Sequence, residues 1–330
     1  MISLENREKQ VINYYLLCNR LKTKIRKECL NWNVGTGRAE SIAEHIYGTQ
    51  MLAIAMCQAY GYDIDISRVS FMLAIHEIEK TIKRSNILLQ IFKSDRKRAI
   101  QYAFRDILPS PELEQLLNEY DNRSTKEALF AYQCDRLETA VQAKINKDRV
   151  KKEEKTSRKT NAFEDSRFVR WFNKSLDFAE NWRNLGAESI KFDPNFTEVS
   201  DYASKVNTSD NDNQENSKAK QVMEYYMLCS KLKEVIRTGW LNWNVSAERV
   251  ESIAEHIYGV QMMAIAMCQA YNYDIDLYKV LLMLAVHETE EIIIGDQHYS
   301  KYPVKIKQSK VTKLYIKYLV NYYQHLLLKN

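Results

Sequence analysis

Apolar residues recur at helical spacing along two consecutive segments of the N-terminal third of the chain. They lie three or four residues apart, which predicts two amphipathic helices, and they include Ile42, Ile46, Met51, Ile54, Ala55, Tyr60, Val69, Met72, Leu73 and Ile75. The sequence GYDID at 61–65 separates the two runs. Gly61 can end the first helix and Asp65 can cap the second. The segment therefore predicts an antiparallel helical hairpin.

The same pattern continues along most of the chain. Further amphipathic helices are predicted at 11–27, 96–108, 111–122, 126–145 and 168–185. The 330 residues include only 8 glycines and 4 prolines, whereas helix-forming Leu, Ala, Glu, Lys and Gln are plentiful. We expect an almost entirely α-helical protein.

The hairpin occurs twice. A shift of 211 positions places Tyr14–Ile82 over Tyr225–Ile293 without a gap, and roughly two-thirds of the positions are identical. The stretch ESIAEHIYG is the same, letter for letter, at 40–48 and 251–259. The period is far too long for a solenoid, so each copy is expected to be a domain or the first half of one.

A polar stretch separates the two copies. Val206–Lys220 is nearly devoid of apolar residues, which predicts a disordered linker. We therefore expect a first domain at 1–200 with extra C-terminal helices, a linker at 201–220 and a second domain at 221–330, called copy one and copy two below. Copy two ends 37 residues after the repeat, so its domain is expected to be truncated. The mixed-charge run at 147–159 indicates a solvated loop or a frayed helix end.

Charge, cysteine usage and hydrophobicity indicate which partners and which compartment to expect. The net charge of +5 is a small difference between 48 basic and 43 acidic residues, which makes no strong case for nucleic-acid binding. The six cysteines form no C-x-x-C pair, which favours a reducing, cytoplasmic compartment. No stretch approaches 18 uninterrupted apolar residues, so we expect a soluble protein with no membrane contact.

Four of the six histidines occupy the two positions that both copies share. His76 and His287 are each followed by a glutamate on the same predicted helix. His45 and His76 lie on the two helices of the hairpin and can face each other. A lone histidine on an apolar helix face is usually a core residue, but clustered imidazoles and carboxylates suit a divalent first-row metal ion.

A further ligand would have to come from elsewhere in the chain. Asp135 lies in the otherwise apolar segment AYQCDRLETAVQAK, where an unpaired buried carboxylate would be costly. The alternative is a surface ion pair of Asp135 with Arg136 or Lys144.

The motifs RAESIAEH, then HE about 30 residues later, then CDRLE occur in this order. With them the chain resembles the HD-domain metal-dependent phosphohydrolases, closest to the bacterial 5'-deoxynucleotidase-like branch. The resemblance implies two HD-type helical bundles in tandem and a divalent cation, with Mn, Co, Mg, Fe and Zn not distinguished. The implied ligands are His45, His76, Glu77, Asp135, His256, His287 and Glu288.

The resemblance also implies catalytic acids, which match copy two at Glu291 and Asp296. Copy one has Lys80 and Ser85 at those positions. Copy two in turn lacks a late aspartate ligand, since 297–330 contains no Asp or Glu. Arg38 and Arg249 match an arginine of the opening motif and are candidates for a phosphate contact.

Two functions from different classes follow. The first is a phosphohydrolase acting on a nucleoside monophosphate or a similar small phosphomonoester. The second is a degenerate HD protein that binds a metal ion or nucleotide or regulates a partner. A third possibility is a homodimer in which the two copies complete each other, with Asp135 of one domain serving as a ligand in the site of the other.

Overall fold

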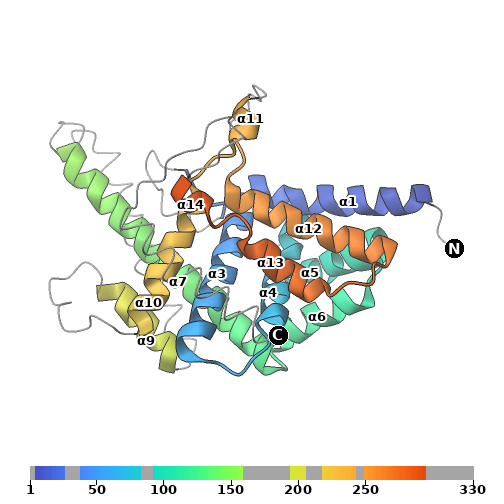
Figure 1. The fold of residues 1–330 in the computed structure, drawn as a ribbon, viewed down its shortest axis with the longest axis horizontal. Coiled ribbons are helices and arrows are strands. Elements are labelled where there is room, and N and C mark those ends of the chain that lie inside the picture. The colour runs from blue at the N-terminus through green and yellow to red at the C-terminus, as the bar shows by residue number, and fades with distance from the viewer. Residues whose placement is uncertain are drawn as a thin grey trace.

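The computed structural model describes residues 4–26, 38–82, 92–158, 194–205, 218–242 and 249–294 (Figure 1). Within these ranges every regular element is a helix, and the only extended pairings are two isolated bridges, Ile25 with Ser41 and Ile236 with Ser252. The all-α prediction is confirmed. None of the helices described is long and apolar enough to cross a membrane.

The elements follow the predicted order. Copy one contains α1 (Leu4–Thr23), α3 (Ile42–Tyr60), α4 (Ile66–Ile75), the 3₁₀ turn η1 (Ile78–Thr81), α5 (Phe92–Gln101), the π-helical η2 (Tyr102–Ile107), α6 (Pro111–Asn122), α7 (Lys126–Arg158) and α9 (Pro194–Lys205). Copy two contains α10 (Lys218–Cys229), the 3₁₀ turn η5 (Ser230–Lys233), α11 (Thr238–Asn242), α12 (Ile253–Tyr271), α13 (Leu277–Val286) and α14 (Glu291–Ile294).

The hairpin in each copy ends and restarts where the sequence predicts. Gly61 adopts the left-handed conformation at φ 68° and closes α3, and the Asp65 side chain accepts from the first amides of α4. Copy two has Asn272 at φ 53° in place of Gly61, and Asp276 caps α13. Asparagine is one of the few non-glycine residues that tolerate this conformation, so both sequences support the same corner.

Two predicted segments differ in part from the structure. Of the two alternatives for the charged run at 147–159, the loop is wrong and a helix end is found, because α7 continues to Arg158. Both ends of the linker predicted at 201–220 are helical, because α9 reaches Lys205 and α10 begins at Lys218. Val199 and Ala203, one helical turn apart, are buried and hold the end of α9 against the core. The predicted helix at 168–185 and residues 206–217 lie outside the described residues.

The first helix of each copy covers the hairpin of the other copy. α1 packs along α12, and α10 packs along α3 (Figure 1). The two hairpins also pack on each other, α3 against α12 and α4 against α13. Equivalent helices thus make equivalent contacts in both directions, as in a dimer built within one chain.

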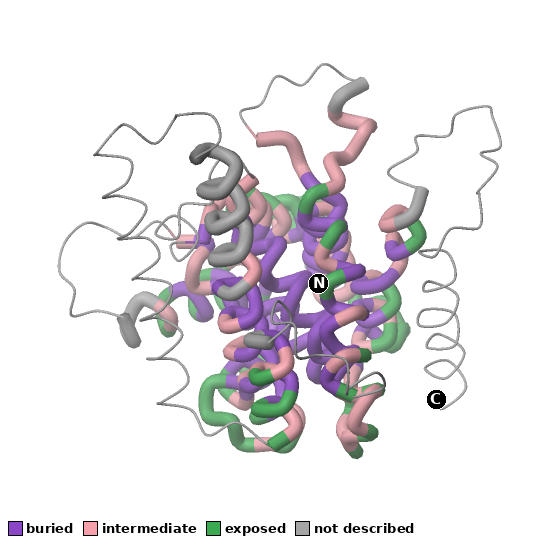
Figure 2. Tube along the Cα trace, turned by 90° about the vertical axis from the view of Figure 1, so that its left-hand side faces the viewer, coloured by how far each residue is buried: buried purple, intermediate pink, exposed green. Residues whose placement is uncertain are grey.

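Because each copy packs its first helix on the hairpin of the other copy, a helix exchange, the two copies share one core. Buried residues from both copies form a single hydrophobic cluster at the centre of the molecule (Figure 2). Tyr14 and Tyr47, both fully buried, bond to Met262 Sδ and the Cys229 carbonyl oxygen in the other copy. Since burial of apolar area is the main favourable term in folding, each copy stabilises the other.

A cluster of four charges lies between the copies. Arg38 Nη2 donates to Glu255 across 2.6 Å, and Arg249 Nη2 donates to Glu44 across 2.8 Å. Each arginine also contacts the glutamate of its own copy, at 3.1 Å for Arg38 and 2.9 Å for Arg249. Both carboxylates are 1% exposed, so the two arginines neutralise charge that would otherwise be buried alone.

We expect Arg249→Met to lower the free energy of unfolding by about 3 kcal/mol, because it leaves two buried carboxylates with one cation. Urea unfolding at neutral pH measures this loss. Lys9→Met is the control, since the Lys9–Glu5 pair is exposed on α1 and should contribute less than about 1 kcal/mol. Equal losses for the two variants would contradict the role assigned to the cluster.

Candidate metal centre

His45 is positioned by the start of α3. Ser41 is the N-cap, and its hydroxyl accepts from the Glu44 amide across 3.2 Å. The Glu44 carboxylate accepts in return from the Ser41 amide across 2.7 Å, which completes a capping box. His45 is the next residue, so the sequence SIAEH fixes the helix start immediately before the candidate ligand.

His76 is positioned by the end of α4. Its Nδ1 donates to the Leu73 carbonyl oxygen across 2.7 Å, which leaves the lone pair of Nε2 directed toward the site. The helix ends here, so Glu77 does not share it as predicted. Glu77 lies in the following turn, with φ −101° and ψ 18°.

The structure brings the four predicted ligands of copy one together. Asp135 on α7 places Oδ1 3.1 Å from His45 Nε2 and 3.7 Å from His76 Nε2. Glu77 Oε1 lies 3.9 Å from both histidine nitrogens. The Tyr120 hydroxyl donates to Asp135 Oδ2 across 3.2 Å. Asp135 therefore faces the histidines, and the alternative of a surface ion pair is wrong.

The donor set fits a divalent ion. The candidate ligand atoms of His45, His76 and Asp135 all lie within 4.8 Å of one another. His76 Nε2 is buried, yet both neighbouring carboxylate oxygens lie beyond hydrogen-bond distance. A cation bound between these groups would satisfy that nitrogen. Two imidazoles and a carboxylate form a common catalytic metal site, and Glu77 is close enough to join them.

Glu138, which was not among the predicted ligands, contacts His45 on the side away from Asp135. Its Oε2 is 2.6 Å from His45 Nδ1, and the carboxylate is fully buried. A carboxylate that accepts from Nδ1 fixes the tautomer in which Nε2 is free to bind a metal. Glu138 follows Asp135 by three residues, so both lie on one face of α7, and this spacing within CDRLE could have revealed it.

The charges around this centre are strongly coupled. Burial and Arg26 lower the pKa of His45, but the Glu138 and Asp135 carboxylates outweigh them and raise it to about 9. Burial raises the pKa of Glu77, but Lys80 and the two histidines lower it to about 2. Lys80 Nζ lies 2.6 Å from Glu77 Oε1. Lys80 therefore neutralises Glu77 in the structure.

Copy two holds a similar but more open cluster. His256, His287 and Glu288 also place one donor atom each within 4.8 Å of the others. Glu288 Oε1 lies 3.6 Å from His256 Nε2 and 3.2 Å from His287 Nε2. His287 Nδ1 contacts the Leu284 carbonyl oxygen at 2.7 Å, as its equivalent does in copy one. The second histidine is thus oriented alike in both copies.

The first histidine is oriented differently. Arg237 Nη1 lies 2.9 Å from His256 Nδ1. A guanidinium can only donate, so Nδ1 must accept and the ring hydrogen resides on Nε2, which then has no lone pair for a metal. The equivalent Arg26 is instead held by Glu40 and Glu138. The described part of copy two contains no counterpart of Glu138.

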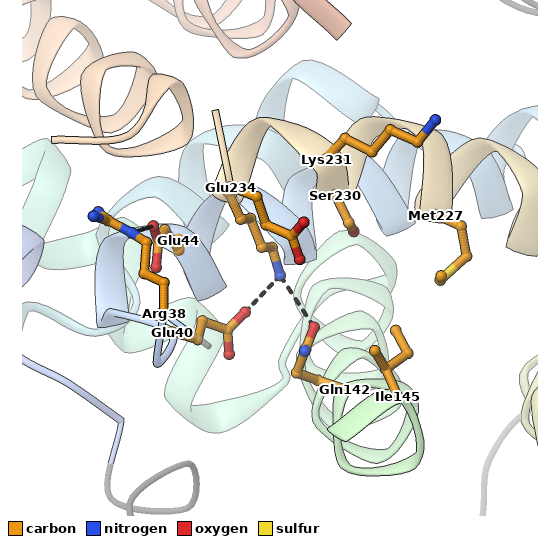
Figure 3. A pocket seen from close by; sticks show the side chains of 10 residues that line it. Arg38, Glu40, Glu44, Gln142, Ile145, Met227, Ser230, Lys231 and Glu234 are labelled. Atoms are coloured by element: carbon orange, nitrogen blue, oxygen red, sulfur yellow. Dashed lines mark hydrogen bonds and ion pairs between the residues drawn. The ribbon is translucent and has the colours of Figure 1, made fainter. Parts of the chain in front are cut away.

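The other predicted site residues lie apart from the copy-one ligands or outside the described residues. Arg38 and Arg249 each donate through all three side-chain nitrogens to groups at the interface between the copies, and Figure 3 shows Arg38 beside Glu44. Neither arginine is directed at the metal ligands by these bonds. Glu291 begins α14 in copy two, and Asp296 lies outside the described residues.

The raised pKa of His45 gives a pH prediction for the metal-free chain. Stability from the protonated ring is fully present below the unfolded pKa of 6.5 and is lost as the pH rises through about 9. The difference between the two pKa values corresponds to about 3 kcal/mol. Denaturant unfolding between pH 6 and 10 should show this loss in the wild-type chain but not in His45→Gln. Identical pH profiles for the two chains would contradict the assigned partners.

Comparison with known proteins identifies the family. A family model described as "HD domain" matches residues 18–171 and 229–325, more than half of the chain. A protein named 5'-deoxynucleotidase HDDC2 from Dictyostelium discoideum is 34% identical over 79 residues, 22% of this chain and 40% of that relative. The human protein of the same name is 33% identical over 79 residues, 24% of this chain and 36% of that relative.

The chain thus spans about two fifths of the length of these curated relatives. No solved structure matches it. The extent of the family-model match shows that the chain belongs to the HD domain family.

Proposed function

We propose that the chain is a metal-dependent phosphohydrolase whose metal centre lies in copy one. His45, His76 and Asp135 would hold the ion, and Glu77 would join them. The observation that carries the proposal is the contact between Glu138 and His45 Nδ1, because it presents Nε2 of His45 to the other ligands. The similarity to proteins named 5'-deoxynucleotidases supports a nucleoside monophosphate or a similar phosphomonoester as the substrate.

A divalent ion bound here would polarise a phosphate oxygen and lower the pKa of a bound water molecule. The chain supplies the surrounding charges. Lys80, whose side chain is 31% exposed, offers a positive charge beside the ligands for an anionic substrate.

One observation favours a second function. Lys80 stands where the family resemblance implies a catalytic glutamate, and it binds Glu77. A site with this substitution could retain an ion and a nucleotide without hydrolysing the phosphate. The second candidate is therefore a metal-binding or nucleotide-binding regulatory module. In that case no phosphate is released, and Glu291 and Asp296, the acids predicted in copy two, would have no catalytic role.

A matched pair of variants tests the proposed function. Purified chain is incubated with ribo- and deoxyribonucleoside 5'-monophosphates and Mn²⁺, Co²⁺, Mg²⁺, Fe²⁺ or Zn²⁺, and phosphate release and bound metal are measured. We expect one ion per chain for the wild type, because only copy one presents a free Nε2 on its first histidine. Asp135→Asn should lower metal affinity and phosphate release by about 100-fold. Glu288→Gln, the control in copy two, should change neither.

The other outcomes separate the alternatives. Bound metal without phosphate release for any substrate would support the regulatory module. Loss of the ion in Glu288→Gln but not in Asp135→Asn would place the centre in copy two. A fall in phosphate release in Glu291→Gln or Asp296→Asn would support the catalytic roles predicted for those acids.

A further inference from the structure

We propose that copy two acts as a built-in positioning subunit for the metal centre of copy one, through Lys233 and Tyr226. These residues hold the Glu138 carboxylate, which in turn orients His45. The inference rests on the proposed metal centre but not on the reaction, so it concerns metal affinity rather than turnover.

Copy two occupies one oxygen of Glu138 and leaves the other for His45. Lys233 Nζ lies 2.9 Å from Glu138 Oε1 and 2.5 Å from Glu40 Oε1. The Tyr226 hydroxyl donates to the same Glu138 Oε1 across 2.9 Å. Glu138 Oε2 is then the oxygen that contacts His45 Nδ1. The chain of contacts thus runs from copy two to a metal ligand in two steps.

Lys233 reaches this position from the turn that follows α10. It is the last residue of η5, and its side chain is 8% exposed. Glu40 and Gln142, which both contact its ammonium group, line a pocket of about 150 Å³ at the junction of the copies (Figure 3). The lysine is therefore a buried interface residue and not a surface charge.

Gly48, the last residue of the stretch ESIAEHIYG, provides the space for Lys233. A Cβ atom at Gly48 would lie 2.5 Å from Lys233 Nζ and 2.7 Å from Glu138 Oε1. In copy two, a Cβ atom at Gly259 would overlap Lys22 of copy one. Each glycine thus leaves room for a lysine from the other copy.

The same interface pair occurs twice, but only the pair of Lys233 and Glu40 is connected to a ligand of copy one, through Glu138. Lys22 Nζ lies 2.5 Å from Glu251, as Lys233 lies 2.5 Å from Glu40. Lys22 also lies over the Tyr15 ring at 5.7 Å, as Lys233 lies over the Tyr226 ring at 5.6 Å. Glu138 has no counterpart among the described residues of copy two. The contacts of Lys22 lead instead through Glu251 and Arg237 to His256, and they do not include the ligands of copy one. The chain therefore contains its own control.

The test compares Lys233→Met with Lys22→Met in the full-length chain. Both substitutions remove an ion pair at the interface, buried for Lys233 and partly buried for Lys22, and both should lower the unfolding temperature. Mn²⁺ affinity, measured by calorimetry or competition with a chromophoric chelator, should fall about tenfold in Lys233→Met, because Glu138 loses one of the partners that fix its orientation. Lys22→Met should bind Mn²⁺ as the wild type does, and Lys233→Arg should recover part of the lost affinity.

A second pair keeps the inference testable if Lys233→Met does not fold. Tyr226→Phe removes only the hydroxyl that contacts Glu138, and Tyr15→Phe is its equivalent in the other half. We expect weaker Mn²⁺ binding in Tyr226→Phe alone.

Three results would overturn the inference. Wild-type affinity in both Lys233→Met and Tyr226→Phe would show that Glu138 needs no support from copy two. Equal loss of affinity in Lys22→Met and Lys233→Met would show general damage to the interface. Absence of Mn²⁺ binding by the wild-type chain would refute the proposed metal centre together with this inference. If the wild-type chain binds Mn²⁺ and the variants bind it equally well, only this inference is refuted.

Discussion

The hydrogen bond between His45 Nδ1 and Glu138 is the interaction on which the proposed site depends. It decides which ring nitrogen faces Asp135 and His76, and therefore whether the cluster can accept a cation. In copy two the same position of the same motif contacts Arg237, which imposes the opposite tautomer. The presence of one buried carboxylate in copy one thus gives the two clusters different histidine tautomers, although their opening sequences are identical.

A carboxylate as deeply buried as Glu138 requires partners of opposite charge. Arg26 comes from its own copy, and Lys233 comes from the other. The exchange of first helices supplies the second partner, because α10 and the turn after it lie against α3. This arrangement also explains the identical stretch ESIAEHIYG. In copy two, Glu251 binds Lys22 and Ser252 caps α12. Glu255 binds Arg38 and Arg249. These residues therefore have structural roles even though the Nε2 atom of His256 has no lone pair for a metal ion.

The sequence predicted features that depend on neighbouring residues. The helical hairpin, its Gly61 corner and the Asp65 cap follow from local rules, and the structure confirms them. The grouping of His45, His76 and Asp135 was also predicted, from the motif order that the family shares. The helix exchange, the pairing of Arg38 with Glu255 and the contact of Arg237 with His256 were not predicted. Each of these contacts depends on how the helices pack in space. Local patterns in a single sequence do not reveal that packing. For the charged end of α7, a loop and a frayed helix end were both left open, because composition says little about helix length.

The most direct test of the account is the location of bound metal. Crystals grown with Mn²⁺ and measured at a wavelength where manganese scatters anomalously would show each ion as a separate peak. We expect one peak per chain, among His45, His76 and Asp135. A peak among His256, His287 and Glu288, or no peak in copy one, would contradict it.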